Sequence, residues 1–262
     1  MQTAINDIPT APWFHALEQA AIGRIASFGM TIEFGWDFNE FKPILQDTYG
    51  TVNPTYDPAA RRVHPSSFWI ALTLRQRVVA TTAFAYFDSG DLEGCVRDQS
   101  IWFDREDDKA ADLGTVHKLP MLIEAPFTVG GATWAAEEWR GYNLPYYLNV
   151  LGRLHIVKYL PVNYLTGFAM LPLVHRGVPK RAYDYPEENV VPALDGTPPT
   201  FTKPISMLAM FLTREQAIQR LLHTGITRLR EDQSSSLTIG SVTVTKRDIE
   251  PSGKQIGSQS RS

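Results

Sequence analysis

One stretch of the sequence, between residues 130 and 160, combines residue types and spacing that could bind an anion. The letters ATWAAEE (132–138) predict a strand, WRGYN (139–143) predicts a turn that contains a glycine, and a helix is expected to begin at Leu144–Pro145. The first N–H groups of a helix have no partner inside it and lie at the positive end of its dipole, where a phosphate can accept their hydrogen bonds. Arg140 adds a permanent cation with forked donors. The pattern predicts a phosphate site formed by Arg140, Gly141, Tyr142, Asn143 and Leu144.

A second interpretation of the same stretch stays open. Pro145 fits the first turn of a helix, but it has no N–H to donate to a phosphate. The letters also fit a plain connection between a strand and a helix, in which Gly141 serves the backbone geometry and the Arg140 side chain is solvated. The sequence alone does not choose between the two.

The turn resembles the phosphate loop of the GNAT acyltransferase superfamily, whose pattern is Gln or Arg, two residues, Gly, one residue, then Gly or Ala, placed between a strand and a helix. Arg140 takes the first place of that pattern, Asn143 the place of the glycine and Pro145 the last place. Asparagine tolerates a left-handed backbone better than most residues, so Pro145 is the larger departure. The resemblance implies that the loop binds the pyrophosphate of acetyl-coenzyme A or another acyl-coenzyme A, used as a co-substrate.

The order of the predicted elements also resembles that of the GNAT superfamily across most of residues 11–212. A helix is predicted to begin at Pro12, and the other predicted helices cover residues 38–49, 145–160, 173–177 and 213–225. The predicted strands cover residues 67–74, 77–87, 121–129, 132–138, 163–171 and 201–212. The resemblance implies an α/β fold with a mixed, mostly antiparallel central sheet flanked by helices.

The resemblance also implies roles for a carboxylate, a backbone N–H and a tyrosine. In the family, a carboxylate on or near the motif strand can remove the proton of the attacking amine, and a backbone N–H on that strand binds the thioester carbonyl. A tyrosine after the following strand can protonate the leaving thiolate. Glu137 and Glu138 are the candidate bases, and as neighbours on a strand at most one would point into the site. Tyr183, with Tyr185 close by, is the candidate acid; solvated glutamates and packed tyrosines are the alternatives.

Length and composition indicate one large domain or two small ones, and the elements favour a single domain over residues 11–230. Residues 88–119 read as a polar, acidic insertion, either a lid or a solvated excursion, and residues 231–262 as a flexible tail.

The formal net charge is −3, without the basic excess of a nucleic-acid binder. There is neither an apolar run long enough to span a membrane nor a signal-peptide pattern, so we expect a cytoplasmic protein. The single cysteine, Cys95, and the histidines show no metal spacing.

The sequence thus predicts an acyl-coenzyme A-dependent N-acyltransferase that acts on an amine of a small molecule, peptide or protein. The acidic insertion favours a cationic acceptor, and a homodimer is left open. The alternative is a GNAT-fold binding or regulatory module without catalysis, which Pro145 and the missing glycine would explain. A third idea, an unrelated fold that acts in an assembly, requires that the strand–turn–helix be absent.

Overall fold

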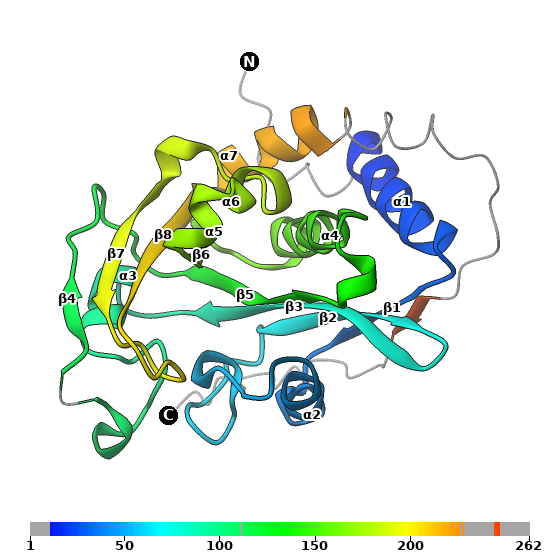
Figure 1. Cartoon of the computed structure of the whole chain (residues 1–262). Helices are drawn as coiled ribbons and strands as arrows, with labels where there is room; N and C mark the ends of the chain where they lie inside the picture. Colours follow the sequence, from blue (N-terminus) through cyan, green and yellow to red (C-terminus); the bar gives the residue numbers. More distant parts are fainter. Residues whose placement is uncertain (1–10, 111, 226, 228–243, 247–262) are drawn as a thin grey trace, which may run out of the picture.

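The computed structural model describes residues 11–110, 112–225, 227 and 244–246. Within them, nine strands form one sheet in the order β4-β7-β8-β6-β5-β3-β2-β1-β9 (Figure 1). The strands are β1 (Thr31–Gly35), β2 (Phe68–Leu74), β3 (Arg77–Phe87), β4 (Gly114–Val116), β5 (Phe127–Ala135), β6 (Tyr164–Met170), β7 (Val190–Gly196), β8 (Ile205–Thr213) and β9 (Val244–Lys246).

Among the described residues, seven α-helices connect or cover these strands: α1 (Pro12–Ser27), α2 (Phe38–Tyr49), α3 (Leu92–Arg97), α4 (Leu144–Tyr159), α5 (Leu171–His175), α6 (Val178–Ala182) and α7 (Arg214–Arg220). Short 3₁₀ helices cover Pro54–Tyr56, Glu106–Asp108, Glu137–Trp139 and Glu187–Asn189, and a π-helical turn, Leu221–Gly225, follows α7.

The pairing of neighbouring strands is antiparallel except at two places, where β5 runs parallel to β6 and β1 runs parallel to β9. The prediction of a mixed, mostly antiparallel central sheet flanked by helices is therefore confirmed. The predicted hairpin of β2 and β3 is also present. Its two-residue turn places Arg75 at φ +49° and Gln76 at φ +66°, the conformation of a type I′ turn, which matches the twist of the strands.

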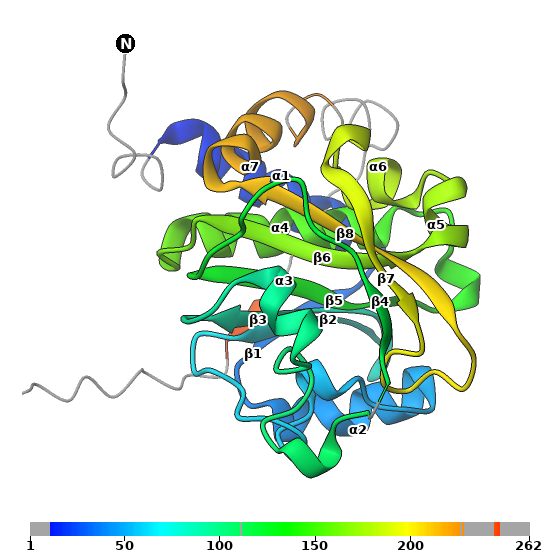
Figure 2. The same cartoon turned by 90° about the vertical axis from the view of Figure 1, so that its left-hand side faces the viewer.

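Two hydrophobic cores hold the helices against the two faces of the sheet (Figure 1, Figure 2). On one face, Leu17 of α1, Leu151 of α4 and Ile218 of α7 are buried in the first core. On the other face, Phe41 of α2 and Cys95 of α3 are buried in the second core. The sheet is thus the middle layer, and α4 lies on the opposite face from α2.

The motif strand differs from its prediction at both ends. We predicted two strands, 121–129 and 132–138, but the structure has one, β5, which runs through Gly130 and Gly131. A Cβ atom at Gly131 would lie 2.5 Å from the hydroxyl of Tyr56 and one at Gly130 would lie 3.2 Å from the ring of Phe84. The two glycines therefore make room for side chains from distant segments and do not interrupt the strand.

The segment 88–119 is a packed part of the domain. It contains α3, a 3₁₀ turn and the edge strand β4, which pairs with β7. Ile101, Trp102 and Leu113 of this segment are buried in the second core, which a solvated excursion would not require. The predicted tail lies largely outside the described residues, apart from β9. No helix in the described part of the chain is long and apolar enough to span a membrane.

Candidate functional site

The parallel pair β5 and β6 separates halfway along its length. Paired residues run from Phe127↔Tyr164 to Gly130↔Gly167, after which the two strands share no further ladder. Beyond that point β5 continues to Ala135 beside β3 alone, and β6 continues to Met170 beside β8 alone. Where the two strands diverge, the backbone N–H and C=O groups on their facing edges therefore no longer pair with each other.

A β-bulge marks β5 just after the point of divergence. The register between β3 and β5 shifts between Thr81 and Ala83, and Ala132 takes φ +48°. The Thr81 hydroxyl donates to the Ala132 carbonyl over 2.9 Å, and the hydroxyls of Thr82 and Thr133 lie 2.9 Å apart. Bulges turn backbone groups out of the regular ladder and are frequent beside active sites.

The turn between β5 and α4 is fixed by an aromatic cluster. The chain leaves β5 through the 3₁₀ helix Glu137–Trp139, passes Gly141 at φ +100° and enters α4 from Asn143, which is left-handed at φ +58°. The rings of Trp139 and Tyr142 lie 5.0 Å apart and pack against Phe28 after the end of α1, at 5.9 and 5.6 Å. Asn143 thus adopts the conformation for which a glycine would otherwise be expected.

Free hydrogen-bond donors gather at this turn. Across the described residues, the N–H groups of Gly141, Asn143 and Leu144 have no protein acceptor, while the Asn143 carbonyl accepts from the N–H groups at the start of α4. The Arg140 side chain is 66% exposed, and its only ion pair among the described residues is a loose one, 3.9 Å from Glu137. The five residues predicted to bind phosphate therefore form one accessible cluster, to which the buried Leu144 contributes its backbone.

The two candidate bases lie beyond the strand. The prediction that Glu137 and Glu138 end the motif strand is wrong, because β5 stops at Ala135 and both glutamates belong to the following 3₁₀ helix. Their side chains are 89% and 50% exposed, and Glu138 forms an ion pair of 2.8 Å with Arg77. They lie beside the turn that we predicted to bind phosphate, and water can reach both carboxylates.

Tyr183 lies beside the middle of α4. The buried Arg153 of α4 donates to the Tyr183 carbonyl and, over 3.5 Å, to the carboxylate of Asp184. A Cβ at Gly152, the neighbour of Arg153, would touch the same Phe84 ring that covers Gly130. The middle of α4 therefore lies level with the point where β5 and β6 part, and the backbone of Tyr183 is held near it.

Two further tyrosines, which sequence reasoning missed, approach from the opposite face. Tyr49 lies near enough to Tyr183, and Tyr56 near enough to Tyr49 and Tyr185, that the charge of one ionised hydroxyl would raise the pKa of its neighbour. Tyr56 is buried and its hydroxyl donates to the Val129 carbonyl of β5 over 3.1 Å. Burial raises the pKa of all four hydroxyls, even though Tyr49 is 42% exposed. These four tyrosines keep their protons at neutral pH.

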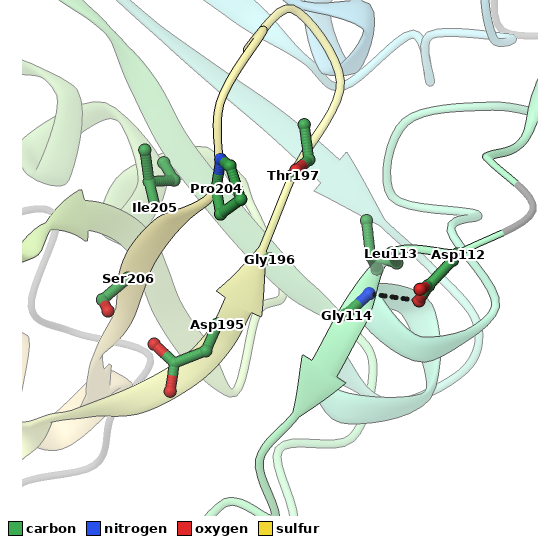
Figure 3. Close-up of a pocket in the computed structure, with 9 residues that line it drawn as sticks. All are labelled: Asp112, Leu113, Gly114, Asp195, Gly196, Thr197, Pro204, Ile205 and Ser206. Atoms are coloured by element: carbon green, nitrogen blue, oxygen red, sulfur yellow. Dashed lines mark hydrogen bonds between the residues drawn. The ribbon is translucent and has the colours of Figure 1, made fainter.

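A separate cavity of about 540 Å³ lies at the β4–β7–β8 edge (Figure 3). Its two carboxylates are already engaged: Asp112 accepts from the Gly114 N–H over 2.9 Å, and Asp195 lies 2.7 Å from His117 Nε2. Hydrogen bonds from Ser206 and His117 lower the pKa of Asp195. None of the predicted site residues lines this cavity. Among the described residues, no three His, Cys, Asp or Glu side chains are grouped to bind a metal ion.

Comparisons with known proteins place acyl-coenzyme A proteins among the similar structures. No protein-family model and no curated protein sequence matches the chain. Mycobacterium smegmatis RimJ in complex with CoA-disulfide is 13% identical at a TM-score of 0.37, and the match spans 62% of each chain. BjaI, a CoA-dependent acyl-homoserine lactone synthase, is 10% identical at a TM-score of 0.45, and the match covers 84% of this chain and 95% of BjaI. Spermidine N-acetyltransferase from Vibrio cholerae is 7% identical at a TM-score of 0.35, and the match covers 78% of this chain and 92% of that protein.

Proposed function

We propose that this protein is an acyl-coenzyme A-dependent N-acyltransferase of GNAT type, which transfers an acyl group to an amine of a small molecule or protein. One observation supports this most strongly: the strands β5 and β6 part at Gly130↔Gly167, and β5 then leads directly into the donor-rich turn at the start of α4. The strand β5 thus connects two sites. One is the turn before α4, which suits a pyrophosphate, and the other is the point of divergence, where unpaired backbone groups suit a thioester. A cytoplasmic location and a homodimer remain predictions from the sequence.

The spacing along α4 suits coenzyme A. Asn143 and Arg153 are ten residues apart on this helix, which corresponds to about 15 Å along its axis. With the pyrophosphate at Arg140 and Asn143, the pantetheine arm would follow the gap between β5 and β6 and bring its sulfur toward Tyr183. Pro145 supplies no donor, so fewer N–H groups would hold the pyrophosphate than in a loop with two glycines.

The chemistry asks little of the protein, because a thioester is already activated. The amine nitrogen attacks the carbonyl carbon, the C–S bond breaks, the amine loses a proton and the thiolate gains one. We assign the second proton to Tyr183, whose burial keeps it protonated. The predicted bases Glu138 and Glu137 lie beside Arg140, at the pyrophosphate end of this path, so we assign the first proton to solvent water. A backbone N–H at the β5 bulge would polarise the carbonyl.

Loss of the loop cation should weaken coenzyme binding without unfolding the protein. We expect Arg140→Ala to raise the Kd for acetyl-coenzyme A about ten- to a hundredfold, because a hydrogen bond between charged groups is lost. The side chain is exposed, so the melting temperature should not change. Isothermal titration calorimetry with acetyl-coenzyme A and longer acyl-coenzymes A measures this, with Arg105→Ala, exposed and distant in sequence, as the matched control.

Equal affinities of the wild type and Arg140→Ala would remove Arg140 from the site. If the folded wild-type protein bound none of these ligands, the enzyme proposal would be wrong, and the alternative of a binding or regulatory module without catalysis would take its place.

The role of Tyr183 predicts a loss in turnover. Tyr183→Phe should lower kcat about a hundredfold while leaving the affinity for acyl-coenzyme A unchanged, because only the proton donor is removed. Burial raises the pKa of this hydroxyl above its usual value, so its ionisation should not slow the wild type below about pH 10. Tyr185→Phe is the control, since a phenyl ring keeps the contact with the Arg153 guanidinium, which lies 4.8 Å from the ring centre. Equal losses in both variants would count against a specific role for Tyr183.

A further inference from the structure

Arg61 carries a buried guanidinium that the mechanism above does not use. It belongs to the loop between α2 and β2, on the face of the sheet opposite α4, and only 8% of the residue is exposed. Its guanidinium carbon lies 4.2 Å from the centre of the Phe87 ring. This contact covers one flat face of the group and leaves its N–H edges directed elsewhere.

The edges of this guanidinium have no partner in the described part of the chain. Nε and Nη1 are fully shielded from solvent and make no hydrogen bond, and among the described residues no carboxylate oxygen lies within 4.0 Å of the group. The acid that acts on it most is Asp104, which is exposed and accepts instead from the backbone N–H of Arg62 over 2.6 Å. Arg61 is thus a desolvated cation without a counter-ion among the residues that the structure describes.

Such a cation is unusual, since a buried charge is normally paired and hydrogen-bonded. Arg153, equally buried, shows the usual arrangement, with bonds to Tyr183 and Asp184. A carboxylate can bind a guanidinium through two N–H groups, either those of Nε and Nη2 or those of Nη1 and Nη2. Nη2 belongs to both arrangements, and in Arg61 it is not among the atoms that are fully shielded and unbonded. An anion that arrives from outside could therefore bind in the bidentate manner that suits a carboxylate.

The position of Arg61 relates it to the proposed acyl-transfer site. Tyr56, five residues earlier on the same loop, lies near enough to Arg61 for the guanidinium charge to act on the pKa of its hydroxyl, and that hydroxyl donates to the Val129 carbonyl, next to Gly130 where β5 and β6 part. The loop thus contacts the strand that would hold the thioester. It does so from the face opposite α4, which leaves the α4 face to the coenzyme.

We propose that Arg61 binds the carboxylate of the acceptor, so that the acceptor is an amino acid or another amine that carries a carboxylate. The proposal rests on the proposed function, because it assigns the second substrate of the same site. It replaces the expectation of a purely cationic acceptor, based on the acidic segment 88–119, by a zwitterionic one. The carboxylate would supply the counter-ion that Arg61 lacks.

Paired acceptors test this directly. Acyl transfer from acetyl-coenzyme A and a long-chain acyl-coenzyme A is measured with L-leucine against isopentylamine and with L-phenylalanine against phenethylamine. In the wild type, kcat/KM should be at least tenfold higher for the amino acid of each pair. Arg61→Met, which keeps the length of the side chain, should bring this ratio close to one, whereas Arg62→Met, an exposed neighbour with the same loss of charge, should leave it unchanged.

Stability and binding separate this proposal from the function on which it rests. Arg61→Met should melt at the wild-type temperature or above it, because an unpaired buried charge is removed; if it did not fold, Arg61→Gln would take its place.

Titration of the protein with L-leucine and L-phenylalanine, without coenzyme, should show binding that Arg61→Met abolishes. Such binding without any acyl transfer would leave the carboxylate site standing and refute the proposed function. Equal rates within each pair, or a ratio that survives in Arg61→Met, would overturn the carboxylate site.

Discussion

Replacing Asp184 with alanine should lower the free energy of unfolding by about 3–5 kcal/mol. The carboxylate of Asp184 is buried between two guanidinium groups, 3.5 Å from Arg153 Nη1 and 2.6 Å from Arg220 Nη2. The Arg153 side chain is itself buried, so the substitution leaves an uncompensated charge inside the protein. Arg220, whose pKa Asp184 raises, loses the same partner.

Urea unfolding, followed by circular dichroism, measures this loss. Asp195→Ala is the control, because Asp195 is mostly exposed beside His117 and its removal should have a far smaller effect. We also expect Asp184→Ala to reduce turnover at temperatures where the variant is still folded, since Asp184 adjoins Tyr183 in the segment that Arg153 holds against α4. A loss of stability no larger than that of the control would mean that the carboxylate is not desolvated as the structure indicates.

Gly152→Ala should destabilise the protein by about 1–3 kcal/mol and weaken acyl-coenzyme A binding at the same time. A Cβ atom at this position would lie 2.2 and 2.3 Å from two ring carbons of Phe84, and that ring also packs on Gly130 of β5. Neither the helix nor the buried ring can move alone. The extra methyl group should therefore push α4 away from the sheet and shift the proposed phosphate-binding turn relative to the point where β5 and β6 diverge.

A matched glycine is available in α1. Gly23 is an exposed glycine within a helix, and a Cβ atom added there would have no neighbour within 4 Å, so Gly23→Ala should stabilise the protein by up to about 1 kcal/mol. The second variant to test is Gly152→Ala combined with Phe84→Leu, which makes room for the methyl group. The double variant should recover part of the coenzyme affinity; if it binds no better than Gly152→Ala alone, the contact with Phe84 is not the cause.

Local signals in the sequence were enough to predict the elements that position the turn at Arg140. The capping box of Thr213 and Gln216 is present at α7, and α4 begins at Leu144, one residue before its prediction. Such signals depend on residues three or four apart. The turn at Arg140 could be predicted for the same reason, since all of its residues are contiguous.

The elements that the sequence did not predict depend on distant partners. We did not predict β1, which is five residues long, or β7, where Pro192 interrupts the pattern and the register with β8 shifts. The run of β5 through Gly130 and Gly131 could not be foreseen, because the reason for these glycines lies at Phe84 and Tyr56.

The missed side chains of the site depend on tertiary structure in the same way. Tyr56 meets Val129 across 73 residues of sequence. The loop that contains Arg61 shows no pattern by which its burial could be predicted, and the lack of a partner for its guanidinium is visible only once the surrounding segments are in place.

The short ladder between β5 and β6 has a consequence for the order in which the molecule is built. In the described part of the chain these four residue pairs are the join between two half-sheets, β5-β3-β2-β1-β9 and β4-β7-β8-β6. A parallel join needs a crossover helix, here α4. During synthesis the strands β1, β2, β3 and β5 leave the ribosome before β6, with the edge strand β4 emerging between β3 and β5, and the seam can close only after the turn at Arg140 and α4 have followed. The proposed coenzyme site therefore lies on the seam between the two half-sheets, where a bound ligand would contact both halves and hold them together.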